Sequence, residues 1–155
     1  MQIQQTRQQI VDIALSLVGY PSVKYSSPYL GKNPPGFDCS GLIVHIINKI
    51  EIFLPPNIRH CNEFLDSFGV FVHEEHKLPG DLIFFSRKGS HPTHIGVVVD
   101  SNHYVHAPGL DGTVVEIAEI SNSIIPPSKD QIYQKNPIGY KRVSIKSGRW
   151  QKLLT

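Results

Sequence analysis

Apolar residues in the first third of the chain recur at the spacing of a helix. From about Gln5 to Val18 they stand three or four positions apart, with Gln, Arg and Asp between them, which predicts an amphipathic helix. A second apolar face repeats from Leu42 to Ile50 and predicts another helix, with Cys39 in its first turn. Asp38 is suited to cap this helix, because a short polar side chain there accepts a hydrogen bond from the first turn.

A short third helix is predicted to end at Gly69. One of its faces carries four apolar residues, namely Ile58, Cys61, Leu65 and Phe68. We therefore expect Cys61 to be packed in the core, with no catalytic or disulfide role.

The segment Tyr20–Gly36, which precedes Cys39, has no sustained period. Its Ser, Pro, Gly and Tyr residues predict a loop of unusual length for a compact domain. Because such loops often form the walls of binding sites, Tyr25 and Tyr29 are candidate ligand contacts.

From Gly69 onward, β-rich runs separated by turns replace the helical pattern. The predicted strands are Val70–Val72, Asp81–Phe85, His94–Asp100, His103–Ala107, Thr113–Ile117 and Ile138–Val143. Residues 121–137 are expected to be irregular. Helices first and strands second predict an α+β domain, with N-terminal helices packed on a mostly antiparallel sheet of about five or six strands.

Length and composition fit one domain over residues 1–155, with its core at about 5–143. The chain has 155 residues, 40% of them hydrophobic, which is enough for one ordinary core. The net charge of +2 gives no reason to expect a nucleic-acid partner. Lys141 and Arg142 belong to a basic C-terminal stretch that we expect to be a solvated surface.

No targeting or membrane-spanning segment is evident in the sequence. No apolar stretch approaches the roughly 18 residues of a membrane span, and no charged region followed by an apolar one opens the chain. The location is not determined by this pattern; we expect a cytoplasmic protein or one delivered by a phage or secretion apparatus.

Cys39 has the sequence context of a nucleophile. A free cysteine has a pKa of about 8.5, and only its thiolate attacks carbonyl carbons well. The N-terminus of a helix favours an anion, and its free N–H groups can also hold the oxyanion of a tetrahedral intermediate. The alternative is a buried cysteine that only packs.

Two histidines in the strand region are candidates for the base that Cys39 needs. If the strands at His94 and His106 form a hairpin across Ser101-Asn102, the two rings meet at one edge of the sheet. Cys39, His94 and His106 would then be nucleophile, base and orienting residue. His91 is the rival base, although it lies in a loop before a proline.

The eight histidines also raise a metal site as an alternative. The pattern His-x-x-His occurs three times, at His73/His76, His91/His94 and His103/His106. In a strand, positions three apart point to opposite faces, so these pairs do not converge on one ion. We expect neither a metal nor a cofactor.

Four blocks in this order resemble the signature blocks of the NlpC-type cysteine peptidases, a papain-like family that acts on bacterial cell walls. They are Phe37-Asp38-Cys39-Ser40-Gly41-Leu42, Leu78–Phe85, His94–Val99 and Tyr104-Val105-His106-Ala107. The resemblance implies a papain-like α+β core with Cys39 as nucleophile, His94 as base and His106 as the third, polar member.

The same resemblance implies a substrate and its contacts. Members of the family hydrolyse peptide bonds in peptidoglycan stem peptides, often between γ-D-glutamate and a diamino acid. Asp38 and Ser40 would contact the substrate, and Tyr25 would replace one aromatic of the segment ahead of the cysteine. That segment here, Ser22–Tyr29, lacks the glycines usual in the family.

Two other functions are alternatives: one uses the same three residues, Cys39, His94 and His106, for a different reaction, and the other has no catalysis. An acyltransferase or transpeptidase would resolve the acyl-enzyme with an amine, lipid or second peptide in place of water. An idle binding module would only pack Cys39. If the protein is a delivered effector, an inhibitor or immunity protein is an expected partner.

Overall fold

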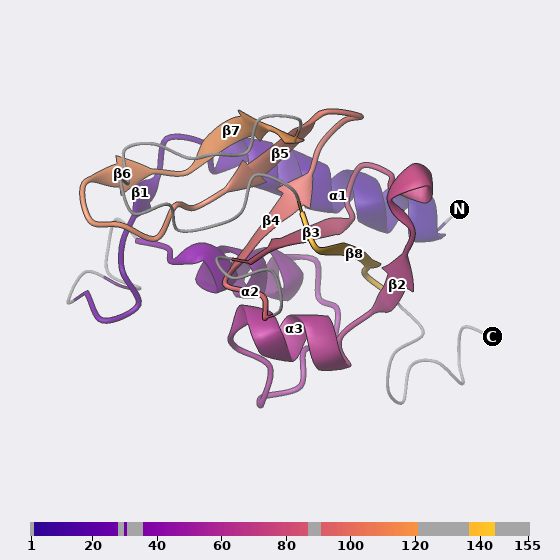
Figure 1. Ribbon diagram of the computed structural model, residues 1–155, viewed down its shortest axis with the longest axis horizontal. Helices are drawn as coiled ribbons and strands as arrows, with labels where there is room; N and C mark the ends of the chain where they lie inside the picture. The colour runs from indigo at the N-terminus through magenta and orange to yellow at the C-terminus, as the bar shows by residue number, and fades with distance from the viewer. Residues whose placement is uncertain (1, 28–29, 31–35, 87–90, 121–136, 145–155) are drawn as a thin grey trace.

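The computed structural model describes residues 2–27, 30, 36–86, 91–120 and 137–144. Its helices are α1 (Gln2–Ser16), α2 (Cys39–Lys49) and α3 (Cys61–Ser67), with a 3-10 turn at Glu74–His76. Its strands are β1 (Pro21–Ser22), β2 (Val70–Val72), β3 (Leu82–Phe85), β4 (His94–Val98), β5 (His103–His106), β6 (Thr113–Val114), β7 (Glu116–Glu119) and β8 (Gly139–Arg142). Figure 1 shows their arrangement.

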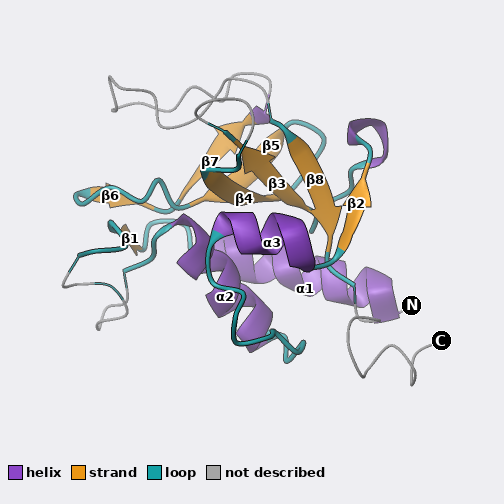
Figure 2. Ribbon diagram, turned by 60° about the horizontal axis from the view of Figure 1, so that its bottom comes forward, coloured by secondary structure: helices purple, strands orange, loops and turns teal. Residues whose placement is uncertain are grey.

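A six-stranded antiparallel sheet forms the centre of the domain. Its strand order is β2-β8-β3-β4-β5-β7, and β1 and β6 form a separate two-stranded ribbon. The three α-helices lie on one side of the sheet (Figure 2). The predicted α+β class, with helices packed on a mostly antiparallel sheet of about five or six strands, is therefore confirmed.

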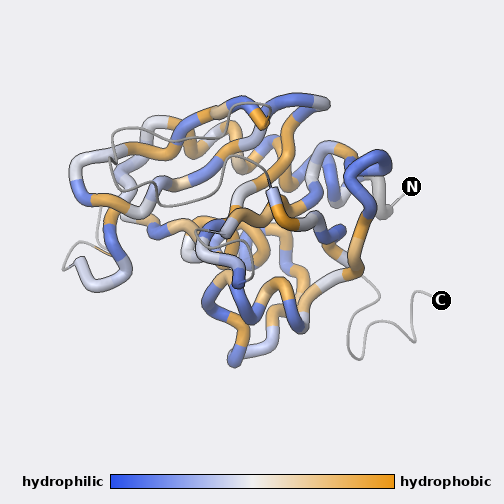
Figure 3. The backbone as a smooth tube through the Cα atoms, viewed as in Figure 1, coloured by the Kyte–Doolittle hydropathy of each residue, from blue (hydrophilic) through white to orange (hydrophobic). Residues whose placement is uncertain are grey.

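The main core lies between the helices and the sheet. The isoleucines of α2 are buried there against β4, as their spacing predicted. Side chains on the opposite face of the sheet form a second, smaller cluster, made of Ile83, Phe85, Val98, Tyr104 and Tyr140. The central strands are drawn largely in the hydrophobic colour, and the turn at Glu74–His76 in the hydrophilic one (Figure 3).

The predicted hairpin joins β4 to β5. Val97 pairs with Val105, and the Asp100 side chain accepts the backbone N–H of Asn102, which closes the turn. Gly96 is needed inside this hairpin, because a Cβ there would lie 2.8 Å from the carbonyl oxygen of Val105. The glycine thus allows β5, and with it His106, to approach β4 closely.

The single strand predicted at Thr113–Ile117 is instead two strands in two sheets. Val115 lies between β6 and β7 and is fully buried. Its N–H donates to the carbonyl of Tyr20, and its carbonyl accepts the N–H of Gly19, both at 2.8 Å. These bonds to the end of the α1 region bend the chain, so that β7 begins afresh at Glu116.

The expectation of a solvated basic surface is wrong for Lys141 and Arg142. The Lys141 ammonium donates to the carbonyl of Leu65 at 2.6 Å. Arg142 holds the buried Asp81 carboxylate through two bonds, at 2.8 and 2.9 Å. The other basic residues of this stretch, beyond 144, lie outside the described residues. None of the described helices has the length and apolar character needed to cross a bilayer.

Candidate active site

The site begins at the N-terminus of α2, which Asp38 caps as predicted. Its carboxylate accepts the backbone N–H of Gly41 at 2.9 Å. A side chain on Gly41 would collide with that carboxylate, so a larger residue here would displace the cap. The cap makes Cys39 the first residue of the helix, where backbone N–H groups lack partners within the helix.

Cys39 is half-buried and faces the beginning of β4. The backbone N–H of Ile95 lies within hydrogen-bonding range of its thiol. Because Ile95 follows His94, this contact places the sulfur at the end of the strand that carries the predicted base. The thiol of Cys61 is also within hydrogen-bonding range.

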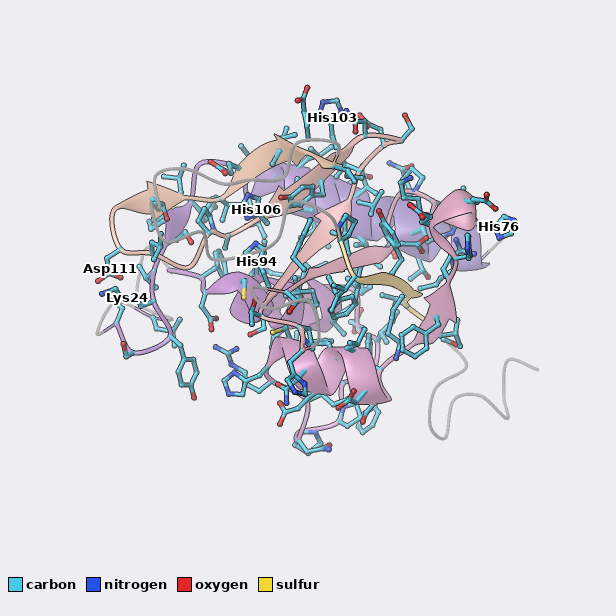
Figure 4. The ribbon with its side chains drawn as sticks, in the orientation of Figure 1. Lys24, His76, His94, His103, His106 and Asp111 are labelled. Atoms are coloured by element: carbon cyan, nitrogen blue, oxygen red, sulfur yellow. The ribbon has the colours of Figure 1, made fainter. Side chains whose placement is uncertain are left out.

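His94 and His106 lie side by side, as expected from the predicted hairpin. Nε2 of His94 lies 2.8 Å from Nδ1 of His106, and the two side chains come from neighbouring strands. Both residues are buried, with exposures of 1% and 0%. Figure 4 shows the two rings together, whereas His76 and His103 lie toward other edges of the molecule.

Glu116, which sequence reasoning missed, extends this pair. Its Oε2 lies 3.0 Å from Nε2 of His106, and its side chain is 40% exposed. No sequence motif marks this residue; only the register of β7 against β5 reveals it.

Burial decides the protonation of the two rings. It lowers the pKa of His94 well below the usual value, and the neighbouring His106 lowers it further. Burial also lowers the pKa of His106, although Glu116 opposes this. Both histidines are therefore neutral at neutral pH.

The surroundings of Cys39 oppose its thiolate, although the N-terminus of a helix favours an anion. The hydrogen bond with Cys61 and burial raise the pKa of the Cys39 thiol, and they outweigh the N–H of Ile95, which lowers it. The resting pair is thus a neutral thiol and a neutral imidazole, so a base must remove the thiol proton during attack.

Arg59 joins the three residues that the resemblance implied as substrate contacts. It donates to Ser40 Oγ at 2.8 Å and to Asp38 Oδ1 at 2.9 Å. Its guanidinium carbon lies 4.9 Å from the centre of the Tyr25 ring. Asp38 and Ser40 are buried, at 6% and 2% exposure, whereas Tyr25 is exposed. Sequence reasoning missed Arg59, because its place depends on how the α2–α3 connection folds back. Tyr29 lies outside the described residues.

Ser22 fastens together two segments that flank Cys39. Its hydroxyl donates to the carbonyl of Phe37 at 3.1 Å and accepts the N–H of Gly109 at 2.8 Å. Nearby, the N–H of Lys24 donates to the Asp111 carboxylate at 3.0 Å (Figure 4). The loop after β5 is thereby held against the segment that leads into α2.

His60 packs edge-on against Tyr25, with ring centroids 4.9 Å apart, whereas four other histidines lie away from the His94–His106 pair. His91, the rival base, is exposed, and His103 pairs with Asp100 at 2.8 Å on the surface. His73 and His76 lie on the exposed 3-10 turn. No three His, Cys, Asp or Glu side chains in the described ranges gather as ligands for a metal ion.

A half-buried cysteine at a helix N-terminus, beside two buried and hydrogen-bonded histidines on an antiparallel sheet, is typical of the papain-like class. The chain belongs to the NlpC/P60 family, whose model matches residues 24–134. The resemblance seen in the sequence is confirmed.

Several curated relatives align with most of this chain. It is 34% identical over 110 residues to the gamma-DL-glutamyl hydrolase of Bacillus subtilis (strain 168), covering 68% of this chain and 24% of that protein. It is 31% identical over 119 residues to the probable peptidoglycan endopeptidase LytE of the same strain, covering 76% and 31%. It is 29% identical over 111 residues to the probable endopeptidase NlpC of Escherichia coli (strain K12), covering 70% and 62%. The chain thus spans less than two thirds of each of these proteins.

Solved structures share the fold. A Staphylococcus aureus protein described as similar to lipoprotein, of the NLP/P60 family, has a TM-score of 0.64 and 31% identity. That match covers 90% of this chain and 41% of the other. The P60 domain of antigen MAP1204 from M. avium subspecies paratuberculosis has a TM-score of 0.65, with coverage of 92% and 97%. At 20% identity, it shows the fold alone.

Proposed function

We propose that this domain is a thiol hydrolase of amide bonds in peptidoglycan stem peptides, with Cys39 as nucleophile, His94 as base and His106 as orienting residue. The hydrogen bond between the two buried histidines carries this proposal, because it holds an uncharged imidazole still beside the helix that begins with Cys39. The names of the endopeptidase relatives support the substrate class.

The reaction follows from these positions. As Cys39 Sγ bonds to the scissile carbonyl carbon, the thiol proton passes to His94 and the carbonyl oxygen gains negative charge. The N–H groups at the start of α2 stabilise that oxyanion. The C–N bond then breaks, the leaving amine takes the proton from His94, and a thioester remains. His94 then removes a proton from water as its oxygen bonds to the thioester carbon, the C–S bond breaks to release the carboxylic acid, and the proton on His94 returns to the Cys39 sulfur.

The finer specificity proposed is the bond between γ-D-glutamate and a diamino acid. The similarity to a gamma-DL-glutamyl hydrolase supports a γ-glutamyl bond. Tyr25, Asp38 and Ser40 are the proposed substrate contacts. Since Arg59 bonds to both buried polar side chains, the substrate meets this cluster first through the exposed Tyr25 and the half-buried Arg59.

Digestion of purified muropeptides, followed by mass spectrometry, tests the proposal. We expect two peptide products, the new amine belonging to the diamino acid, and no products with Cys39→Ala. Products joined to an added amine in place of water would indicate an acyltransferase. Intact muropeptides after prolonged incubation with folded protein would overturn the hydrolase.

A further inference from the structure

Strand β7 places a carboxylate directly behind the histidine pair. β7 is the edge strand next to β5, and Glu116 is the register partner of His106 (Figure 1). Directly opposed residues of an antiparallel pair hold their Cβ atoms about 4.5–5.5 Å apart on one face. The backbone thus fixes Glu116 beside His106, and the 3.0 Å contact between Oε2 and Nε2 follows.

The carboxylate gives this chain of hydrogen bonds a direction. An ionised carboxylate only accepts, so Nε2 of His106 must carry a hydrogen. A neutral imidazole has one N–H, and Nδ1 of His106 is therefore an acceptor. Nε2 of His94, 2.8 Å away, must then be the donor.

Counting the ring hydrogens of His94 in the same way identifies the nitrogen that can accept a proton. Because Nε2 of the neutral His94 ring holds its hydrogen, Nδ1 holds a lone pair. If the order were reversed, with His106 donating to His94, Nδ1 of His94 would hold a hydrogen. It could then not take a proton from a thiol.

We propose that Glu116 is a positioning residue that sets the tautomers of His106 and His94, so that Nδ1 of His94 takes the Cys39 proton. This inference rests on the roles proposed above for Cys39 and His94. No proton passes to Glu116. When His94 becomes positively charged during attack, the carboxylate one ring away stabilises that charge.

Glu119 provides a matched control. It lies on the same strand, carries the same charge, is exposed and stands opposite His103. Positions 116 and 119 point to opposite faces of β7, so Glu119→Ala removes a carboxylate from the strand without touching the histidine pair.

The first measurement reads the tautomers directly. In protein with nitrogen-15 in its histidines, two-bond proton–nitrogen spectra at neutral pH distinguish Nδ1–H from Nε2–H. We expect Nε2–H at both His94 and His106, assigned with His94→Gln and His106→Gln. Glu116→Ala should produce a mixture of tautomers at both rings, whereas Glu119→Ala should change neither. Unaltered tautomers in folded Glu116→Ala would overturn the proposal.

The second measurement is the rate of muropeptide cleavage. Glu116→Ala should lower kcat by about 10- to 100-fold, the range seen when an orienting partner is lost. KM should stay nearly constant, because Glu116 is separated from Cys39 by two imidazole rings. Glu116→Gln keeps an acceptor oxygen and should recover part of kcat. A loss confined to KM would contradict the proposal.

The two measurements separate this inference from the proposed function. If the wild type cleaves no muropeptide but its tautomers respond to Glu116→Ala, the hydrolase fails and the tautomer control stands. If muropeptides are cleaved and the tautomers do not respond, only the inference fails.

Discussion

The Cys61 thiol lies within hydrogen-bonding range of the Cys39 thiol, and it also donates to the carbonyl of Pro92 at 3.2 Å. Because the hydrogen of Cys61 is directed to Pro92, Cys39 is the donor between the two sulfurs. A donated hydrogen bond stabilises the protonated thiol, which is why Cys61 raises the pKa of Cys39. Cys61 packs against the core as expected, but it also has this electrostatic effect.

Cys61→Ala should therefore activate Cys39 toward alkylation. Without the acceptor sulfur, the pKa of Cys39 falls and more thiolate is present at about pH 7. The rate of carbamidomethylation by iodoacetamide, measured at Cys39 by peptide mass spectrometry across a pH series, should have its midpoint at lower pH than in the wild type. Cys39→Ala serves as the control that reports labelling of Cys61 alone. An unmoved midpoint would argue against the contact.

The pH dependence of kcat/KM should be broad. His94 must be neutral to accept a proton, and its pKa lies well below 6.5, so activity should hold as pH falls through 6.5 and decline only below it. The pKa of the Cys39 thiol is raised well above 9.0, so the thiol stays protonated across this pH range. Its titration should therefore add no inflection to the profile there. Initial rates at low substrate concentration test this. An acid midpoint at or above 6.5 would show that His94 is not the buried neutral base.

The fold itself should weaken in acid. His94 and His106 have lower pKa values folded than the ordinary 6.5, so below 6.5 the unfolded chain binds more protons than the native one. The free energy of unfolding should therefore decrease as pH falls from 6.5 toward the folded values, and be unaffected by these groups above 6.5. Denaturant titrations at several pH values measure this. The decrease of the unfolding free energy with falling pH should be less steep in His94→Gln than in the wild type. An equally steep decrease would show that His94 is not a buried group with a lowered pKa.

Substitutions in the histidine pair should have graded effects on turnover. Cys39→Ala removes the nucleophile and should abolish it, and His94→Ala should lower kcat by about 10⁴-fold or more. His106→Ala should cost about 10- to 100-fold, since this ring orients another. His91→Ala is the matched control and should retain full activity. Loss of activity in His91→Ala, with His94→Ala active, would reverse the choice of base.

Breaking the ion pair between the buried Asp81 and Arg142 should destabilise the protein. Asp81→Ala removes a fully buried carboxylate, but the Arg142 side chain is 26% exposed and also donates to the carbonyl of His76, so the loss should stay below the roughly 3–5 kcal/mol of a fully buried pair. Urea denaturation should show this loss. Glu75→Ala, whose side chain is 76% exposed on the 3-10 turn, should change stability by less than about 0.5 kcal/mol. Similar midpoints for the two variants would contradict the role given to Asp81.

The parts of the site that local sequence determines were predictable. Asp38 caps α2 because a short polar residue precedes an apolar face of helical period, and this placed Cys39 correctly. The Ser101-Asn102 turn set the hairpin, which brought His94 and His106 together. Both features depend on residues close in the chain.

The parts that depend on distant contacts were not predictable. Glu116 faces His106 only because the chain bends at Val115, whose backbone bonds to Tyr20 and Gly19 are invisible in the sequence pattern. Arg59 reaches Asp38 across 21 positions of chain. The buried position of Lys141 and the half-buried position of Arg142 likewise follow from where β8 inserts into the sheet.

The Ser22 hydroxyl has a consequence for how the site can open. It is one atom shared by the backbone of Phe37, two positions before Cys39, and the backbone of Gly109, three positions after His106. Because both segments bond to this one hydroxyl, a shift of the segment before Cys39 moves the segment after His106 with it. A peptide that enters the site therefore displaces both segments or neither.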